Sequence, residues 1–243
     1  MARSLVVHVL SGPRHVPGPN EEHARFARNI YFDVCSDTGD SRSNIFKLTF
    51  ACHHHGSALA YVNEELKNNL ALVTQAISQD GDNLRYCSPS MKGSPWVVRK
   101  AVDNAGEALQ YASDAIRDDT DIVFAAVCND GAALQYASER IRNDAGFVVA
   151  AVKSQPVEVM QFLRGTTWAN NCFIAKLAVT TNAYTFRFVG EIPQDNWWIC
   201  LQAIKVNGWH LRFASARLQG DTYLQQVAQE TINECNVPAG VFQ

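Results

Sequence analysis

An eight-residue stretch, Gly106 to Ser113, recurs almost unchanged at Gly131 to Ser138. The first copy reads Gly-Glu-Ala-Leu-Gln-Tyr-Ala-Ser, and the second has alanine in place of the glutamate. Leu109 and Leu134 hold the same place in the two copies, 25 residues apart. A fixed period in this range predicts a repeat architecture, in which each unit packs mainly against its neighbours.

Five weaker copies flank this pair at steps of 25 or 26 residues. All seven share an apolar residue at the leucine position and an aromatic ring two residues later. The leucine position holds Leu59, Leu84, Leu109, Leu134, Met160, Phe186 and Leu211, and the ring position holds Tyr61, Tyr86, Tyr111, Tyr136, Phe162, Phe188 and Phe213. Because phenylalanine replaces tyrosine three times, the fold needs the bulk of the ring and not its hydroxyl.

Each unit begins with a predicted helix. Residues that cap helices, such as Asn143-Asp144, precede segments with apolar residues at helical spacing, as in Val123, Ala126 and Val127. Several of these segments end at a pair such as Asp130-Gly131, and we expect the glycine to close the helix in the left-handed conformation. The Ala-Leu-Gln-Tyr-Ala part then predicts one or two further helical turns, and the following serine predicts a cap for the next turn.

The fifth and sixth copies depart from this pattern. Pro156-Val157 and Asn182-Ala183 stand where other copies have the corner glycine. We therefore expect the corners of these two units to be built differently from the rest.

The repeats predict an all-α protein, an α-solenoid of about seven 25-residue two-helix units over residues 44–220. Residues 1–43 form an irregular N-terminal segment, either a degraded eighth repeat or a separate element. In it we expect one short strand over Ser4 to Leu10 and a helix over Glu21 to Asp33. Residues 221–243 are expected to form a C-terminal capping helix and tail, because terminal units must present a polar outer face to water.

The unit Asn/Asp-Gly-x-Ala-Leu-x-Tyr-Ala-Ser resembles a tandem helical repeat family catalogued only as a domain of unknown function. The match is strongest over residues 95–152 and weakest over 153–193. This resemblance implies helical pairs that stack on one another. It implies no catalytic residue, cofactor or ligand.

Composition narrows the classes of partner and compartment. The chain of 243 residues has a net charge of −3, so no basic field favours nucleic acid, which we expect to be an unlikely partner. The longest early apolar run, Leu5 to Leu10, is too short to span a bilayer, so we expect no membrane association. The seven cysteines include no Cys-x-x-Cys pair, which favours reduced core residues in an intracellular, most simply cytoplasmic, protein.

No catalytic motif emerges, so we predict no enzyme activity, no catalytic residue and no cofactor. The most conspicuous cluster of potential metal ligands is His53, His54 and His55. These residues occupy the last turn before the corner glycine, where polar side chains favourably meet free carbonyls. Three consecutive helical positions point in three directions, so the cluster is at most a weak metal candidate.

Two rows of equivalent positions are candidates for contact with a partner. The position after the signature leucine is small or polar in every copy, so we expect it to face solvent and bind a partner. Its candidates are Arg85, Gln110, Gln135, Gln161, Arg187 and Arg212. A basic residue eight positions after the leucine forms a second, ridge-like row, Lys67, Lys92, Arg117 and Arg142, which nearby Glu64, Asp114 and Glu139 are expected to screen.

Function is predicted less sharply than fold. The first hypothesis is a non-enzymatic scaffold that mediates protein–protein interaction with an unidentified partner. The alternative is a repeat protein that binds single-stranded RNA through its C-terminal half, where Arg164, Arg187, Arg212 and Arg217 accompany four tryptophans. Those tryptophans, Trp168, Trp197, Trp198 and Trp209, are either an aromatic binding patch or core residues.

Overall fold

The computed structural model describes residues 49–50, 52–53 and 56–236. Every element within those residues is a helix and none is a strand, so the predicted all-α class is confirmed. The expected strand and helix of the segment 1–43 lie outside the described residues. Over the same described stretches, none of the helices has both the length and the apolar character needed to cross a membrane.

Long α-helices recur once per unit and form its first element. Asn69, Asp119, Asp144, Asn171 and Asn196 each precede one of them and accept hydrogen bonds from two of its first backbone N–H groups, which otherwise lack partners. The long helices are α3 (Leu70–Gln79), α5 (Pro95–Asn104), α7 (Thr120–Asn129), α9 (Ala145–Ser154), α11 (Cys172–Thr181), α13 (Trp197–Val206) and α15 (Thr222–Asn236).

Two short helical segments follow each long helix in most units, so the predicted second helix is a 3-10 helix joined to a single α-turn. The 3-10 helices are η1 (Gly56–Tyr61), η3 (Gly81–Tyr86), η4 (Gly106–Tyr111), η5 (Gly131–Tyr136), η7 (Ala183–Arg187) and η8 (Gly208–Phe213). The α-turns are α4 (Pro89–Lys92), α6 (Asp114–Arg117), α8 (Glu139–Arg142), α12 (Glu191–Gln194) and α14 (Ala216–Gln219), and short 3-10 turns η2 (Leu66–Asn68) and η6 (Thr167–Asn170) replace them in two units.

The predicted serine caps are present in three of the α-turns. The side chains of Ser88, Ser138 and Ser215 accept a hydrogen bond from a backbone N–H in the turn that each begins. Ser113 precedes α6 without such a bond.

The fifth unit is built differently, as expected, and the sixth is not. In the fifth, α10 (Pro156–Leu163) replaces the 3-10 helix, with proline at its start, where no backbone donor is needed. In the sixth, Asn182 caps the 3-10 helix by accepting from the N–H of Tyr184, as Asp130 does from Ala132. The backbone of Asn182 is extended, as it is at Asp130, so the expectation of an altered sixth corner was wrong, although the 3-10 helix that follows is one residue shorter than η5.

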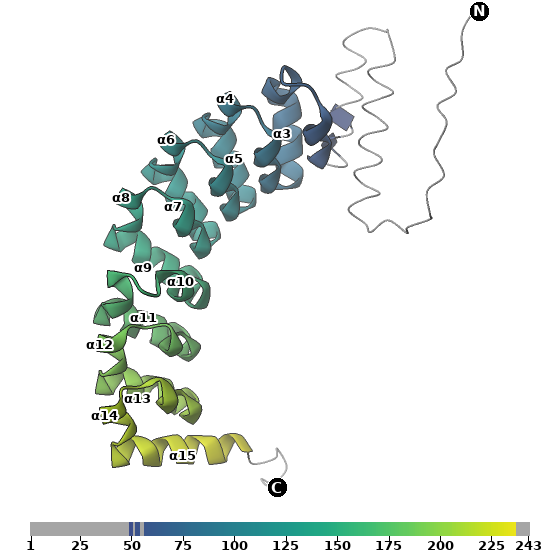
Figure 1. The fold of residues 1–243 in the computed structure, drawn as a ribbon. Helices are drawn as coiled ribbons and strands as arrows, with labels where there is room; N and C mark the ends of the chain where they lie inside the picture. The colour runs from purple at the N-terminus through teal and green to yellow at the C-terminus, as the bar shows by residue number, and fades with distance from the viewer. Residues whose placement is uncertain (1–48, 51, 54–55, 237–243) are drawn as a thin grey trace, which may run out of the picture.

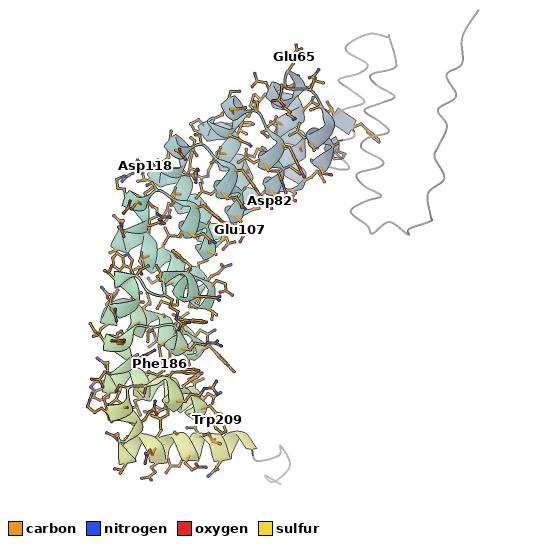
Figure 2. All side chains as sticks on the ribbon, viewed as in Figure 1. Glu65, Asp82, Glu107, Asp118, Phe186 and Trp209 are labelled. Carbon is orange, nitrogen blue, oxygen red and sulfur yellow. The ribbon has the colours of Figure 1, made fainter. Side chains whose placement is uncertain are left out.

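The described units follow one another along an arc (Figure 1). Each long helix contacts the next, from α3 with α5 through to α13 with α15. The labels of α4, α6, α8, α12 and α14 follow the convex outer side of this arc (Figure 1). Figure 2 shows Asp82, Glu107 and Trp209, the second residues of three 3-10 helices, on the concave side, which we call the inner side.

The corner glycines serve a different purpose from the one predicted. Among the described residues only Gly165 has a positive φ, so none of the corner glycines is left-handed. A Cβ added at Gly81, Gly106 or Gly131 would instead lie 2.3 to 2.6 Å from a backbone carbonyl oxygen of the following long helix. That oxygen belongs to an alanine twenty residues later, such as Ala126 for Gly106. Glycine is present because successive units approach each other closely at this point.

Backbone hydrogen bonds join successive units at the α-turns. The N–H of Ser113 donates to Lys92 O at 3.0 Å, and the N–H of Ser138 donates to Arg117 O at 2.8 Å. Between these contacts lies a continuous apolar core that includes fully buried Leu109 and Leu134. Five of the signature rings, Tyr86, Tyr111, Tyr136, Phe162 and Phe213, are only half-buried at its edge, whereas Phe188 is buried.

Candidate partner-binding face

Two rows of side chains emerge from the 3-10 helices on the inner side. A 3-10 helix has about three residues per turn, so its second and fifth residues lie on one face. In η4 these are Glu107 and Gln110, while Ala108 and Leu109 between them are completely buried. The repeated architecture therefore presents the second and fifth positions of every such helix side by side.

The fifth positions are the row predicted from the sequence. Arg85, Arg187 and Arg212 are exposed, and Gln110 and Gln135 are partly exposed. Gln161 is also exposed, although it lies on α10, which replaces the 3-10 helix of its unit. The expectation that this row faces solvent agrees with the structure. Whether it binds a partner stays a prediction.

The second positions were missed by the sequence analysis. They are Ser57, Asp82, Glu107, Ala132, Tyr184 and Trp209. Tyr184 is 57% exposed and Trp209 is 61% exposed, which is unusual for large rings. The signal was available, because this position varies freely at the same period as the predicted row.

The inner arginines lie over aromatic rings. The guanidinium carbon of Arg187 lies 4.8 Å from the centre of the Phe188 ring, and that of Arg212 lies 4.6 Å from the centre of Phe213. Arg85 lies between two rings, 5.3 Å from Tyr86 and 5.6 Å from Tyr111. Stacking of this kind orients the guanidinium and restricts its rotamers.

Charge changes sign along the two rows. The N-terminal part carries Asp82 and Glu107, and Asp82 forms an ion pair with Arg85 at 3.6 Å. In the C-terminal part the corresponding second positions are the uncharged rings of Tyr184 and Trp209, and the fifth positions are Arg187 and Arg212 in place of glutamine. The C-terminal part of the rows is therefore cationic and aromatic.

A buried histidine supports the rings of the C-terminal part. His210 is 3% exposed, and its Nδ1 lies 3.1 Å from the carbonyl oxygen of Ala203. The Tyr184 ring of the preceding unit packs edge-on against the His210 ring, with 5.2 Å between ring centres. Burial lowers the pKa of His210 below its ordinary value, because the charged imidazolium loses hydration, and Arg212 nearby acts in the same direction.

A groove closes the inner side at its C-terminal end, between η8 and α15. It has a volume of about 640 Å³. Trp209 and Arg212 line it from η8, and Gln225, Gln229 and Ile232 line it from α15. The groove thus combines an aromatic ring, a cation and amide groups that can hydrogen-bond a polypeptide backbone.

The predicted basic ridge is largely occupied by local contacts. Lys67 pairs with Glu64 at 2.9 Å, and Arg117 pairs with Asp114 at 2.6 Å. Arg142 donates to the carbonyl oxygen of Gln135 at 3.2 Å. Glu64 and Asp114 therefore screen their neighbours as predicted, whereas Arg142 bonds to a backbone carbonyl instead of the predicted Glu139. Lys92 contributes its backbone carbonyl to the bond between units described above.

A different pair of arginines joins units on the outer side. Arg140 donates to the carboxylate of Asp118 at 3.0 Å, and Arg217 does the same to Asp195 at 3.1 Å. Each of these carboxylates also accepts a hydrogen bond from a serine of the following unit, and these bonds lower its pKa. These arginines therefore belong to the contacts between units.

The four tryptophans of the C-terminal half do not form one patch. Trp168 is half-buried against the core, and Trp197 stacks on Tyr223 with 5.9 Å between ring centres. Trp198 is 69% exposed on α13, and Trp209 lies on the inner side (Figure 2). Core packing thus accounts for Trp168 and Trp197, while Trp198 and Trp209 are exposed, and their binding to a partner stays a prediction.

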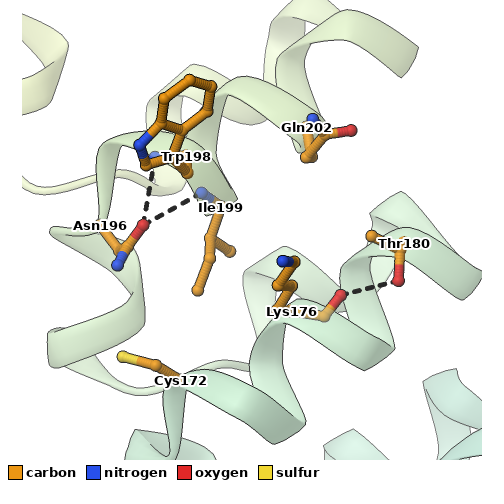
Figure 3. A pocket seen from close by; sticks show the side chains of 7 residues that line it. All are labelled: Cys172, Lys176, Thr180, Asn196, Trp198, Ile199 and Gln202. Atoms are coloured by element: carbon orange, nitrogen blue, oxygen red, sulfur yellow. Dashed lines mark hydrogen bonds between the residues drawn. The ribbon is translucent and has the colours of Figure 1, made fainter.

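Trp198 borders a second pocket, between α11 and α13 (Figure 3). The pocket has a volume of about 460 Å³ and is lined mainly by apolar surface. Lys176 and Cys172 reach it from α11, and Asn196 fixes its rim by accepting from the N–H groups of Trp198 and Ile199. This pocket lies on the long helices, apart from the inner rows.

The histidine cluster is described only at His53, which lies 2.6 Å from the side-chain nitrogen of Gln75 through its Nδ1. His54 and His55 lie outside the described residues. In the part of the chain that the structure describes, no three His, Cys, Asp or Glu side chains gather into a potential metal site.

Cys52, Cys87, Cys128, Cys172 and Cys200 are free cysteines. Cys52, Cys87 and Cys200 are buried, as predicted, whereas Cys128 is exposed and Cys172 is partly exposed.

Comparison with known proteins finds a family model similar to part of the repeat region. Three stretches, residues 49–92, 97–131 and 121–164, match the model of a family described as a domain of unknown function (DUF4116). The predicted resemblance to a tandem repeat family of that kind is thus confirmed. Neither the comparison with curated proteins nor that with solved structures finds a match.

Proposed function

With DUF4116 repeats in tandem over residues 49–164 as the premise, we propose that this chain is a non-enzymatic helical-repeat scaffold that binds a partner protein through its inner side. The observation that carries this proposal is the pair of inner rows. Their side chains recur at the repeat period, reach the surface, and differ in chemistry from unit to unit, while the residues between them are buried. Stacked repeats characteristically use such extended concave surfaces for recognition.

Single-stranded RNA is the alternative partner. The exposed rings and arginines of the C-terminal part favour it, because rings stack on bases and arginines contact phosphates. Asp82 and Glu107 oppose it, because they would repel a polyanion that followed the whole inner side. The division of the tryptophans among separate locations also removes part of the reason for this alternative.

We also infer a reducing intracellular compartment, most simply the cytoplasm. The inference is supported by buried free cysteines whose neighbours are apolar core residues. Burial raises the pKa of Cys52 to about 11 and that of Cys87 to about 12, so both thiols stay protonated and unreactive.

The test of the scaffold proposal compares two triple variants with the wild-type chain. In the inner variant, Gln110, Arg187 and Arg212 are replaced by alanine, so that both the N-terminal and the C-terminal part of the inner side are changed. In the outer variant, alanine replaces Asp114, Glu139 and Glu191, which are exposed at the starts of α6, α8 and α12. Bound proteins and RNA are quantified after gentle capture from cell extract.

We expect a set of proteins to be retained by the wild-type chain and the outer variant and to be depleted on the inner variant. Equal retention by both variants would contradict recognition through the inner side. Depletion of RNA instead of protein would favour the alternative.

A further inference from the structure

Given the proposed function, on which this inference rests, we infer that the C-terminal part of the inner side recognises an acidic peptide segment. The segment carries carboxylates about three residues apart, each next to an apolar side chain. The receiving site comprises two similar pairs of side chains in successive units, Tyr184 with Arg187 and Trp209 with Arg212, and the groove beside α15.

The arginines supply the affinity for carboxylates. Each guanidinium lies over the ring of the next residue, at 4.8 Å in Arg187 and 4.6 Å in Arg212. A guanidinium held in this way keeps its in-plane N–H groups available for a carboxylate, which it binds with two parallel hydrogen bonds. Because stacking already restricts the side chain, less conformational entropy is lost when the ligand binds.

The exposed rings supply apolar contacts beside each arginine. Tyr184 precedes Arg187 by one 3-10 turn, and Trp209 precedes Arg212 in the same way, so ring and cation share a face. Tyr184 is held in place by its edge-on contact with buried His210. A ligand with an apolar side chain next to its carboxylate matches this combination.

The groove accommodates the backbone of the segment. Gln225 and Gln229 line it from α15 opposite Trp209, and amide side chains both donate to and accept from peptide groups. Glu230 is not among the residues that line the groove, and its carboxylate accepts a hydrogen bond from Gln226 of the same helix at 2.8 Å. The walls formed by Leu211 and Ile232 remain apolar.

The spacing follows from the repeat. Helices that pack against each other lie about 8–10 Å apart, and an extended chain advances about 3.3 Å per residue. One unit therefore corresponds to about three residues of an extended peptide. Charge favours a peptide over RNA, because a short acidic segment can end before the carboxylates of Asp82 and Glu107, which a longer polyanion would meet.

The experiment measures fluorescence anisotropy of a labelled peptide of about twelve residues, built from Asp-Leu-Ser triplets so that it spans about four units. The matched peptide has asparagine in place of aspartate, and a labelled oligouridylate serves as the RNA probe. The full chain is compared with Arg187→Gln, Arg212→Gln, Trp209→Ala and the control Arg140→Gln. Arg140→Gln makes the same charge change on the outer side. Circular dichroism melting establishes that each variant is folded.

We expect the aspartate peptide to bind with micromolar affinity and the asparagine peptide to bind about tenfold more weakly or worse. Each inner variant should weaken binding by about tenfold, and Arg140→Gln should leave it within about twofold. No binding of the aspartate peptide, equal binding of the asparagine peptide, or an equal loss in Arg140→Gln would overturn the inference. Tighter binding of the oligouridylate, lost in the same inner variants, would also overturn it.

Failure here is distinguishable from failure of the scaffold proposal. If extract proteins are retained through the inner side but the aspartate peptide does not bind, only the acidic-peptide inference is wrong. If the inner and outer triple variants retain proteins equally, the scaffold proposal itself is contradicted.

Discussion

Replacing Gly106 by alanine tests whether the corner glycines set the approach of one unit to the next. An added Cβ would lie 2.6 Å from the carbonyl oxygen of Ala126 and 2.6 Å from the Cβ of Asp130. Ordinary van der Waals contact begins near 3.4 Å, so both contacts are short by roughly 0.8 Å. The obstructing atoms are a backbone oxygen and a Cβ, neither of which can rotate away, so the two units must separate or tilt.

The expected cost combines two effects. Overpacking of this kind typically destabilises by about 1–3 kcal/mol. Alanine also restricts the unfolded chain, which returns about 0.4–1 kcal/mol where the native φ suits it, as it does at Gly106. We therefore expect Gly106→Ala to lower the free energy of unfolding by about 1–2 kcal/mol.

Urea unfolding followed by circular dichroism measures the change, with Gly93→Ala as the matched control. A Cβ at Gly93 would meet its nearest atoms at 3.6 Å, an ordinary contact. We expect this control to be neutral or slightly stabilising. If Gly106→Ala unfolds at the same urea concentration as Gly93→Ala, close approach is not the reason for glycine at the corners.

The core and two kinds of titrating side chain give three further predictions. Leu109→Ala should lower the free energy of unfolding by about 2–5 kcal/mol, and Tyr111→Ala should lower it by less because the ring is only half-buried. Urea unfolding measures both changes, and a larger loss for Tyr111→Ala would contradict the burial described. Because the pKa of His210 is lowered in the folded state, its contribution to the free energy of unfolding is complete at pH values above the ordinary pKa of 6.5. That contribution is lost as the pH falls through the folded-state pKa. On acidification, the melting temperature of His210→Asn should therefore fall less than that of the wild-type chain. Equal falls in the two proteins would contradict this. A thiol reagent at neutral pH should modify exposed Cys128 quickly and Cys200 slowly, because burial raises the Cys200 pKa to about 11; peptide mapping that shows equal rates would exclude this.

The choice of asparagine at His210 comes from the repeat itself. Asn83 occupies the same place in η3, where its side chain donates to the carbonyl oxygen of Ala76 at 3.0 Å. His210 meets Ala203 in the same way. Asparagine should thus keep this contact while removing the titrating group.

Much of the candidate site was predictable because repeats make equivalent positions comparable. The row from Arg85 to Arg212 was found because it is polar in most copies, while the positions before and after it hold apolar or aromatic residues. The structure places this row at the surface. The row from Asp82 to Trp209 was not found, although it varies at the same period, because its members range from alanine to tryptophan and share no polar character. The structure shows that this position is exposed and that Trp209 and Arg212, three residues apart in η8, line the same groove.

The sequence by itself determined the period, the all-helical class, and the Asn and Asp caps at the starts of the long helices. These depend on spacing along the chain and on bonds between near neighbours, which residue types alone specify. The tertiary structure alone decided why Gly106 is glycine, how far the Tyr111 ring is buried, and which side chains reach the inner side. Those properties depend on the distance and angle between one unit and the next, which arise only when the units pack together.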